Sequence, residues 1–216
     1  MQAEIDPASA ATGSGALIAF PLALTLSRLV LGPVVIWAAL HGAARGWFAL
    51  ILIAALLSDY FDGAVARRLG VARPWLRRLD SMVDIVFNVC VAAAAFVLEP
   101  ATMRAGVSAI ALLIGSELVC IAVSLIRFRS LPGTHCYSAK LYGLVLFVIS
   151  LGVLCFGWGP WSLWVLFAFG LAANAECLAV LLRADEAPVD VPGVLARLRA
   201  RDAGERASVA SSRSRA

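Results

Sequence analysis

Long apolar runs recur along almost the whole 216-residue sequence and limit what the chain can fold into. A helix needs about 20 mostly apolar residues to cross a bilayer, and six segments reach that length. They are residues 21–41, 47–67, 79–98, 104–127, 138–159 and 161–183. Hydrophobic residues make up 62% of the sequence and charged residues 15%, which is far from the average of a soluble domain. We therefore predict an all-α, polytopic membrane protein with six transmembrane helices.

The two ends of the chain differ from this apolar centre. Residues 1–16 form a short N-terminal segment, and residues 184–216 turn polar and basic, with a closing run rich in serine and arginine. Segments of low hydrophobicity cannot bury enough apolar surface to become ordered. We expect a six-helix transmembrane domain over residues 17–183, followed by a cytoplasmic tail that is partly disordered.

The basic residues gather on one side of the predicted membrane segments. Short cytoplasmic loops carry an excess of lysine and arginine. One side would carry the basic residues in and around 68–78 and 128–137 and those of the tail, whereas the other would carry only Arg45 and Arg104. We therefore expect both termini and both loops to be cytoplasmic. The net charge of +4 reflects this topology and does not indicate a nucleic-acid partner, because no basic patch with interleaved aromatic residues accompanies it.

The composition of the basic set also suggests a source. Lys140 is its only lysine, and all the other members are arginines. This bias is typical of a GC-rich bacterial genome. We therefore expect the protein to lie in a bacterial plasma (inner) membrane.

The segment from Ser58 to Asp84 contains the main candidate residues for a functional site. Two helices would each present two aspartates here, at the cytoplasmic edge of the membrane. On the first helix an acidic, then small, then basic face is formed by Asp59, Asp62, Gly63, Ala66 and Arg67, at positions i, i+3, i+4, i+7 and i+8.

The second helix has a matching stripe. Leu76, Asp80 and Asp84 follow one another at intervals of four residues, so they lie on one face. Carboxylates near hydrocarbon are costly, and four of them together require a counter-charge. Arg28 and Arg67 would neutralise part of it, but a tight all-oxygen cluster suits hard divalent cations such as Mg²⁺ or Mn²⁺. Two such ions could stabilise the attacking and leaving oxygens of a phosphoryl displacement.

This pattern resembles the signature of the CDP-alcohol phosphatidyltransferase family, in which four aspartates follow a fixed spacing. The match comprises Asp59, Asp62, Gly63, Ala66, Arg67, Asp80 and Asp84. Leu76 departs from the signature, because the family has its second glycine there. The resemblance extends to the six-span layout, to the segment PLALTLSRL at residues 21–29, and to Lys140 at the start of the fifth span.

The resemblance implies roles for these residues. Asp59, Asp62 and Asp80 would bind two metal ions, and Asp84 would act as the general base beside them and complete the acidic metal site. Contacts with the CDP moiety would come from Asp59, Gly63, Ala66 and Arg67. The implied reaction transfers a substituted phosphate from a donor such as CDP-diacylglycerol to an acceptor alcohol and releases CMP. A homodimer and contact with membrane lipids are implied in the same way.

Several polar residues outside the signature have two interpretations. Arg28, Arg127, Arg129 and Lys140 could bind a phosphate of the acceptor, whereas the last three could equally anchor the cytoplasmic membrane edge. The polar residues Glu117, Asn174 and Glu176 lie within spans, where they could serve function or could bond neighbouring helices.

Two other functions stay open. A small membrane transporter could be lined by the same acidic residues, but it would predict internal repeats or broken helices, and the sequence has neither. A catalytically altered relative of the family is the other, because Leu76 replaces a glycine.

Overall fold

The computed structural model describes residues 7–68, 74–129 and 137–183 of the chain. All regular structure in these three ranges is helical. The helices are α1 (Pro7–Leu40), α2 (Arg45–Arg68), α3 (Pro74–Leu98), α4 (Pro100–Ala105), α5 (Val107–Phe128), α6 (Tyr137–Phe156) and α7 (Trp161–Arg183). The predicted tail at 184–216 and most of the loop 128–137 lie outside the described residues.

Five of these helices are long and apolar enough to cross a membrane. The candidate spans are Leu22–Leu40 of α1, Leu79–Leu98 of α3, and the greater part or all of α5, α6 and α7. The remaining long helix is α2, which has 24 residues and is not one of these five candidate spans. The prediction of an all-α polytopic membrane protein is confirmed.

Helix boundaries differ from the predicted segments at three places. α1 begins at Pro7, inside the predicted N-terminal segment, and α3 begins at Pro74, inside the predicted loop 68–78. Proline fits the first turn of a helix, where its missing N–H is not needed. The predicted span 104–127 is interrupted at Gly106, which lies between α4 and α5 and where a Cβ atom would overlap the Leu163 side chain.

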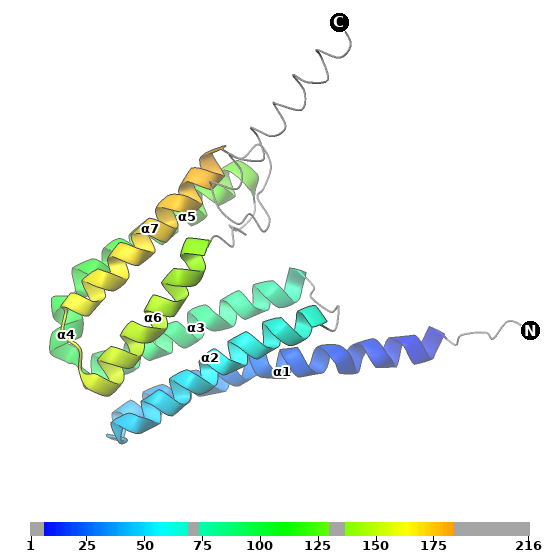
Figure 1. The fold of residues 1–216 in the computed structure, drawn as a ribbon, viewed down its shortest axis with the longest axis horizontal. Coiled ribbons are helices and arrows are strands. Elements are labelled where there is room, and N and C mark those ends of the chain that lie inside the picture. Colours follow the sequence, from blue (N-terminus) through cyan, green and yellow to red (C-terminus); the bar gives the residue numbers. More distant parts are fainter. Residues whose placement is uncertain (1–6, 69–73, 130–136, 184–216) are drawn as a thin grey trace, which may run out of the picture. The chain divides into compact units, whose positions relative to one another are not determined.

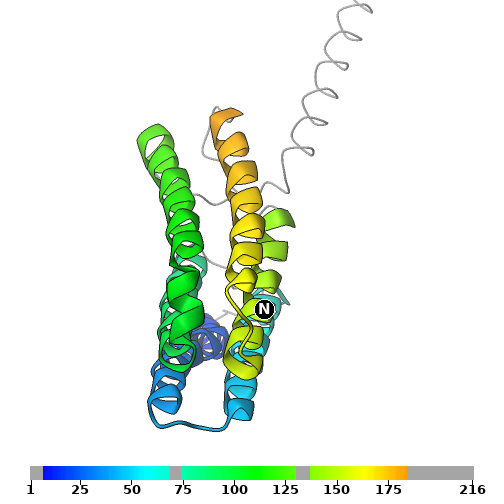
Figure 2. The ribbon, with the colours of Figure 1, turned by 90° about the vertical axis from the view of Figure 1, so that its left-hand side faces the viewer.

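The chain divides into two compact units, and the first comprises residues 1–104 and 150–158. In this unit α1 packs against both α2 and α3 (Figure 1). At Gly32 a Cβ atom would lie 3.0 Å from the Cys90 sulfur, so the small residue allows α1 to approach α3 closely. The loop at residues 41–44 joins α1 to α2 and is visible at the bottom of Figure 2. Gly42 adopts a φ of 64° there.

The second unit comprises residues 105–149 and 159–216, and its α5 packs against α7. Gly170 of α7 has a role similar to that of Gly32, because a Cβ atom there would overlap the Leu113 side chain. Small residues at helix contacts are typical of membrane proteins, in which packing drives association.

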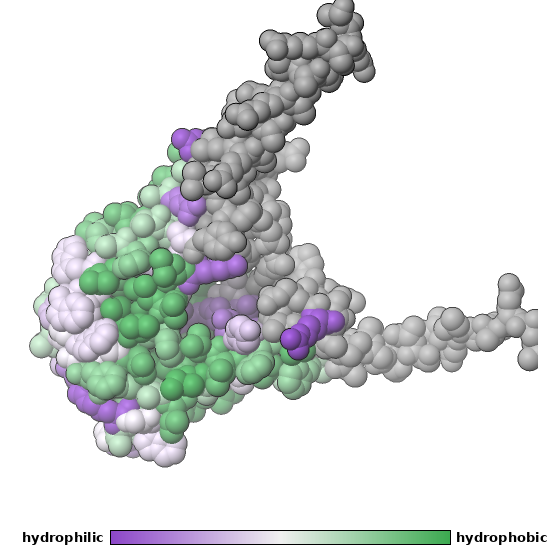
Figure 3. Space-filling model, viewed as in Figure 1, coloured by the Kyte–Doolittle hydropathy of each residue, from purple (hydrophilic) through white to green (hydrophobic). Residues whose placement is uncertain are grey.

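Much of the surface drawn in Figure 3 is hydrophobic. Large apolar side chains such as Val30, Ile85 and Ile126 are exposed on α1, α3 and α5. In water, exposed apolar side chains of this kind would cause the protein to associate without specificity. In a bilayer the same side chains would contact lipid, which is favourable. The surface therefore agrees with a multi-pass membrane protein.

Candidate functional site

The four aspartates of the sequence pattern come together in the first unit. Asp59 and Asp62 lie one turn apart on α2, and Asp80 and Asp84 lie one turn apart on α3. The helical repeat places each pair on one face, and the packing of both helices on α1 brings the two pairs to a single side chain of α1. That side chain is Arg28.

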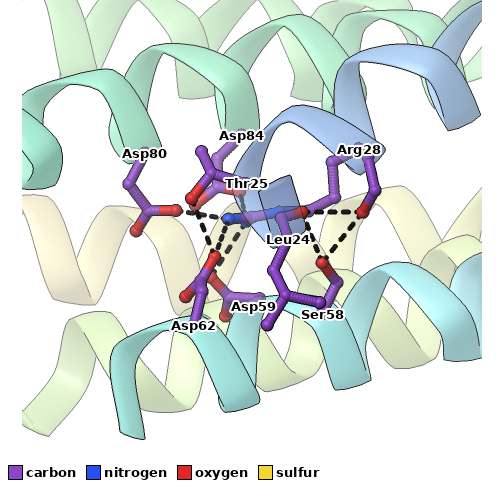
Figure 4. Close-up of polar contacts among 9 residues, drawn as sticks. Leu24, Thr25, Arg28, Ser58, Asp59, Asp62, Asp80 and Asp84 are labelled. Carbon is purple, nitrogen blue, oxygen red and sulfur yellow. Dashed lines mark hydrogen bonds and ion pairs between the residues drawn. The ribbon is translucent and has the colours of Figure 1, made fainter. Parts of the chain in front are cut away.

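Arg28 lies between the four carboxylates (Figure 4). Its Nη1 atom donates to Asp59 Oδ1 at 2.9 Å and also to Asp84 Oδ1. Its Nη2 atom donates to Asp62 Oδ2 at 2.7 Å and also to Asp80 Oδ1. The Arg28 side chain is only 2% exposed. One guanidinium thus serves as the common ion-pair partner of the whole cluster.

The charges of this cluster do not balance. Four carboxylates against one guanidinium leave a formal charge of −3. Asp62 is the most enclosed carboxylate, at 5% exposure, whereas Asp59 and Asp84 are 47% and 40% exposed. Negative charge that is partly withdrawn from water requires further cations or hydrogen-bond donors. The cluster therefore has the electrostatic character of a cation site.

Hydroxyl groups fix the cluster from α1 and α2. The buried Thr25 hydroxyl donates to Asp62 Oδ2 at 3.1 Å. Ser58 donates to the Leu24 carbonyl oxygen at 2.6 Å, and its hydroxyl lies 3.1 Å from that of Ser27. These bonds set the register of α1 against α2 and orient the Asp62 carboxylate.

The roles of Thr25, Ser27 and Ser58 were not predicted from the sequence. A signal was present, because hydroxyl residues in an apolar helix need a hydrogen-bond partner within the protein. The sequence does not say which partner each hydroxyl finds.

The geometry fits a divalent cation. Asp59, Asp62 and Asp80 each offer a ligand atom, and these atoms lie within 4.8 Å of one another. Oxygens on opposite sides of a Mg²⁺ ion lie about 4.2 Å apart, twice the usual metal–oxygen distance. Oxygens that are adjacent on one ion lie closer, about 3 Å apart, so the three carboxylates would draw together when they bind it. An all-carboxylate set is the donor chemistry that Mg²⁺ and Mn²⁺ prefer.

The residues assigned to CDP lie near these aspartates in the sequence. Gly63, Ala66 and Arg67 belong to α2, but they are outside the residues whose side chains the structure describes, so their contact with CDP stays a prediction. Leu76 lies on the first turn of α3 and is 6% exposed. The side chain that replaces the family's glycine is thus packed within the protein.

Arg127, Arg129 and Lys140 belong to the second unit. Arg127 Nη1 donates to the carbonyl oxygens of Leu181 at 3.1 Å and Leu182 at 2.5 Å, near the end of α7. Arg129 ends α5 in a left-handed conformation, with φ 53°. Arg127 therefore makes the contact of a helix-capping cation. A phosphate-binding role for these three residues stays a prediction.

Two of the three polar residues within the spans bond neighbouring helices of this unit. Asn174 donates from Nδ2 to the Ser116 hydroxyl at 2.8 Å, and Glu176 accepts a hydrogen bond from Ser138. These bonds link α7 to α5 and α6. They agree with the interpretation of Asn174 and Glu176 as residues that join helices. Glu117 is exposed on α5.

The fold and the cluster together define a class of protein: an α-helical, multi-pass membrane protein with an acidic site of four aspartates on two helices. Comparison with known families makes this specific. The sequence profile of CDP-alcohol phosphatidyltransferase matches residues 18–174, which is most of the chain. The chain belongs to the CDP-alcohol phosphatidyltransferase family. No curated protein and no solved structure matches it.

Proposed function

We propose that this protein transfers a phosphatidyl or other substituted phosphate group from a CDP-alcohol, such as CDP-diacylglycerol, to an acceptor alcohol and releases CMP. Membership of the family supports a transferase. The observation that carries the proposal is the convergence of Asp59, Asp62, Asp80 and Asp84 on one place, in the order and spacing of the signature.

The aspartates divide into two groups in this proposal. Asp59, Asp62 and Asp80 would bind two Mg²⁺ or Mn²⁺ ions, because their oxygens form the compact ligand set. The bound ions would neutralise charge on the diphosphate oxygens, which is the main requirement of phosphoryl transfer.

Asp84 is the general base in this reaction. It stands outside the compact three-residue ligand set, and its carboxylate is 40% exposed, so an acceptor hydroxyl can reach it. Asp84 takes the hydroxyl proton as the acceptor oxygen bonds to the phosphorus that carries the diacylglycerol. The bridging P–O bond of the diphosphate breaks, and CMP leaves with the bonding electron pair. The product is a phosphodiester lipid.

The membrane placement of this reaction is part of the proposal. The arginines around 68–78 adjoin the ends of α2 and α3 that carry the aspartates. By the positive-inside rule those ends face the cytoplasm. We place the site at the cytoplasmic face of a bacterial plasma membrane, where the site can bind a lipid donor that lies in the bilayer. We expect the protein to be a homodimer.

The test is a direct assay of the purified protein in lipid nanodiscs with Mg²⁺ and CDP-diacylglycerol. Candidate acceptors are glycerol phosphate, inositol phosphate, serine and choline, with CMP release and the lipid product measured by mass spectrometry. The proposal expects CMP and one phosphodiester lipid with at least one acceptor, and no product after Asp59→Asn.

A matched control is Glu99→Gln. Glu99 forms an ion pair with Arg45 at 2.6 Å and directly follows the last residue of α3, 15 residues beyond Asp84, a separation of about 22 Å along a helix. The control should retain the activity. Absence of CMP release with every acceptor and with other CDP-alcohols would contradict the proposal.

A further inference from the structure

Arg28 bonds all three carboxylates that form the compact ligand set. A Mg²⁺ ion lies about 2.0–2.1 Å from each ligand oxygen. The Arg28 guanidinium already places Nη1 2.9 Å from Asp59 Oδ1 and Nη2 2.7 Å from Asp62 Oδ2. A cation and a guanidinium also repel each other at such distances. A cation bound to these carboxylates would therefore compete with the guanidinium for them.

The Arg28 side chain is attached in a way that permits it to leave. All four hydrogen bonds come from the two terminal nitrogens. Among the described residues, Arg28 Nε is the buried side-chain nitrogen without a hydrogen-bond partner. A buried N–H without a partner is costly, so this position of Arg28 is not fully satisfied. A long side chain bonded only at its tip can withdraw without unfolding the helix.

We propose that Arg28 is an internal counter-ion that offsets part of the cluster's negative charge before cations bind, and that cation binding displaces it from the carboxylates. Once displaced, its planar guanidinium is free to pair with a phosphate oxygen of the donor. This inference rests on the cation binding in the proposed function and adds a competition that the function alone does not require.

The competition predicts the direction in which one substitution changes the affinity for Mn²⁺. When only a fraction of the protein has the site open, the apparent dissociation constant exceeds the intrinsic one by the inverse of that fraction. Arg28→Gln removes the competing charge and leaves a shorter side chain that ends in a neutral amide. If Arg28 is withdrawn in about a tenth of the molecules or fewer, the variant should bind Mn²⁺ about tenfold more tightly or better. A residue that merely held the ligands in place would produce the opposite result.

The experiment measures Mn²⁺ binding to the purified protein without nucleotide, by calorimetry and electron paramagnetic resonance. Unfolding temperatures are recorded in EDTA and in Mn²⁺. We expect Arg28→Gln to unfold at a lower temperature in EDTA, to bind Mn²⁺ more tightly, and to gain more stability from Mn²⁺ than the native protein. Arg45→Gln is the matched control, because it also removes an arginine from an ion pair, and it should bind Mn²⁺ as the native protein does.

A second measurement uses the native protein, so its result does not depend on whether the Arg28→Gln variant folds. Phenylglyoxal modification of Arg28, followed by mass spectrometry, should be slow in EDTA and faster in Mn²⁺. Equal or weaker Mn²⁺ binding by folded Arg28→Gln would overturn the inference, and so would unchanged modification of Arg28. If neither the native protein nor the variant bound Mn²⁺, the cation site of the proposed function would itself be wrong. Binding by the native protein with no gain in the variant would overturn the displacement alone.

Discussion

Replacing Thr25 by valine tests how the acidic site is built. The Thr25 hydroxyl donates to Asp62 Oδ2 at 3.1 Å, and the side chain is 1% exposed. Valine has nearly the same shape, so the packing between α1 and α2 is retained while the bond to the ligand is lost. Residues that orient metal ligands typically change metal affinity or activity by about 10- to 100-fold when they are mutated. We expect Thr25→Val to weaken Mn²⁺ binding and CMP release within that range.

Three measurements separate orientation from stability. The first is the Mn²⁺ dissociation constant, the second is kcat/KM for CMP release, and the third is the unfolding temperature. Thr25→Ser is the matched control, because it keeps the hydroxyl, and it should remain within about threefold of the native protein. Unchanged Mn²⁺ affinity and kcat/KM in well-folded Thr25→Val would refute the argument that Thr25 orients Asp62.

Three further predictions follow from the site and the topology. Asp84→Asn should reduce CMP release by at least about 100-fold while Mn²⁺ and CDP-diacylglycerol still bind, and near-normal turnover at saturating acceptor would contradict its role as base. Leu76→Gly should change CDP-diacylglycerol affinity without changing the Mg²⁺ requirement. This is measured by CMP release across a Mg²⁺ titration, and activity in the variant alone would mean that Leu76 blocks the native site. A cysteine engineered into residues 68–78 should resist a membrane-impermeant maleimide applied to intact cells, and labelling from outside would show that the topology is inverted.

The acidic site is predictable from the sequence because its spacing is local. A helix fixes which residues share a face, so the intervals between Asp59 and Asp62, and between Asp80 and Asp84, are enough to assign each pair to a common face. The long apolar runs predict the helices for a similarly local reason. Boundaries are less accurate at Pro7 and Pro74, because each proline fits equally well in a loop and in the first turn of a helix.

The position of Arg28 cannot be obtained in this way. Its four partners lie 31 to 56 residues away along the chain. They meet only because α1 packs against α2 and α3 together, at a register set by contacts such as that of Gly32 with Cys90. The sequence indicates that Arg28 and Arg67 could offset the acidic charge, and it does not indicate that one arginine reaches every carboxylate.

The short loop between α1 and α2 has a consequence for how the protein enters the membrane during synthesis. Only residues 47–57 of the predicted span 47–67 form an uninterrupted apolar run, and Asp59 and Asp62 follow this run within α2. Each aspartate at the centre of an inserting helix costs about 2.5–3.5 kcal/mol, so α2 alone is a poor substrate for the insertion machinery. Arg28 of α1 offsets part of the charge of these aspartates, and only residues 41–44 separate the two helices. We therefore expect α1 and α2 to leave the translocon as a hairpin, and a chain that begins after α1 to be retained and degraded in cells.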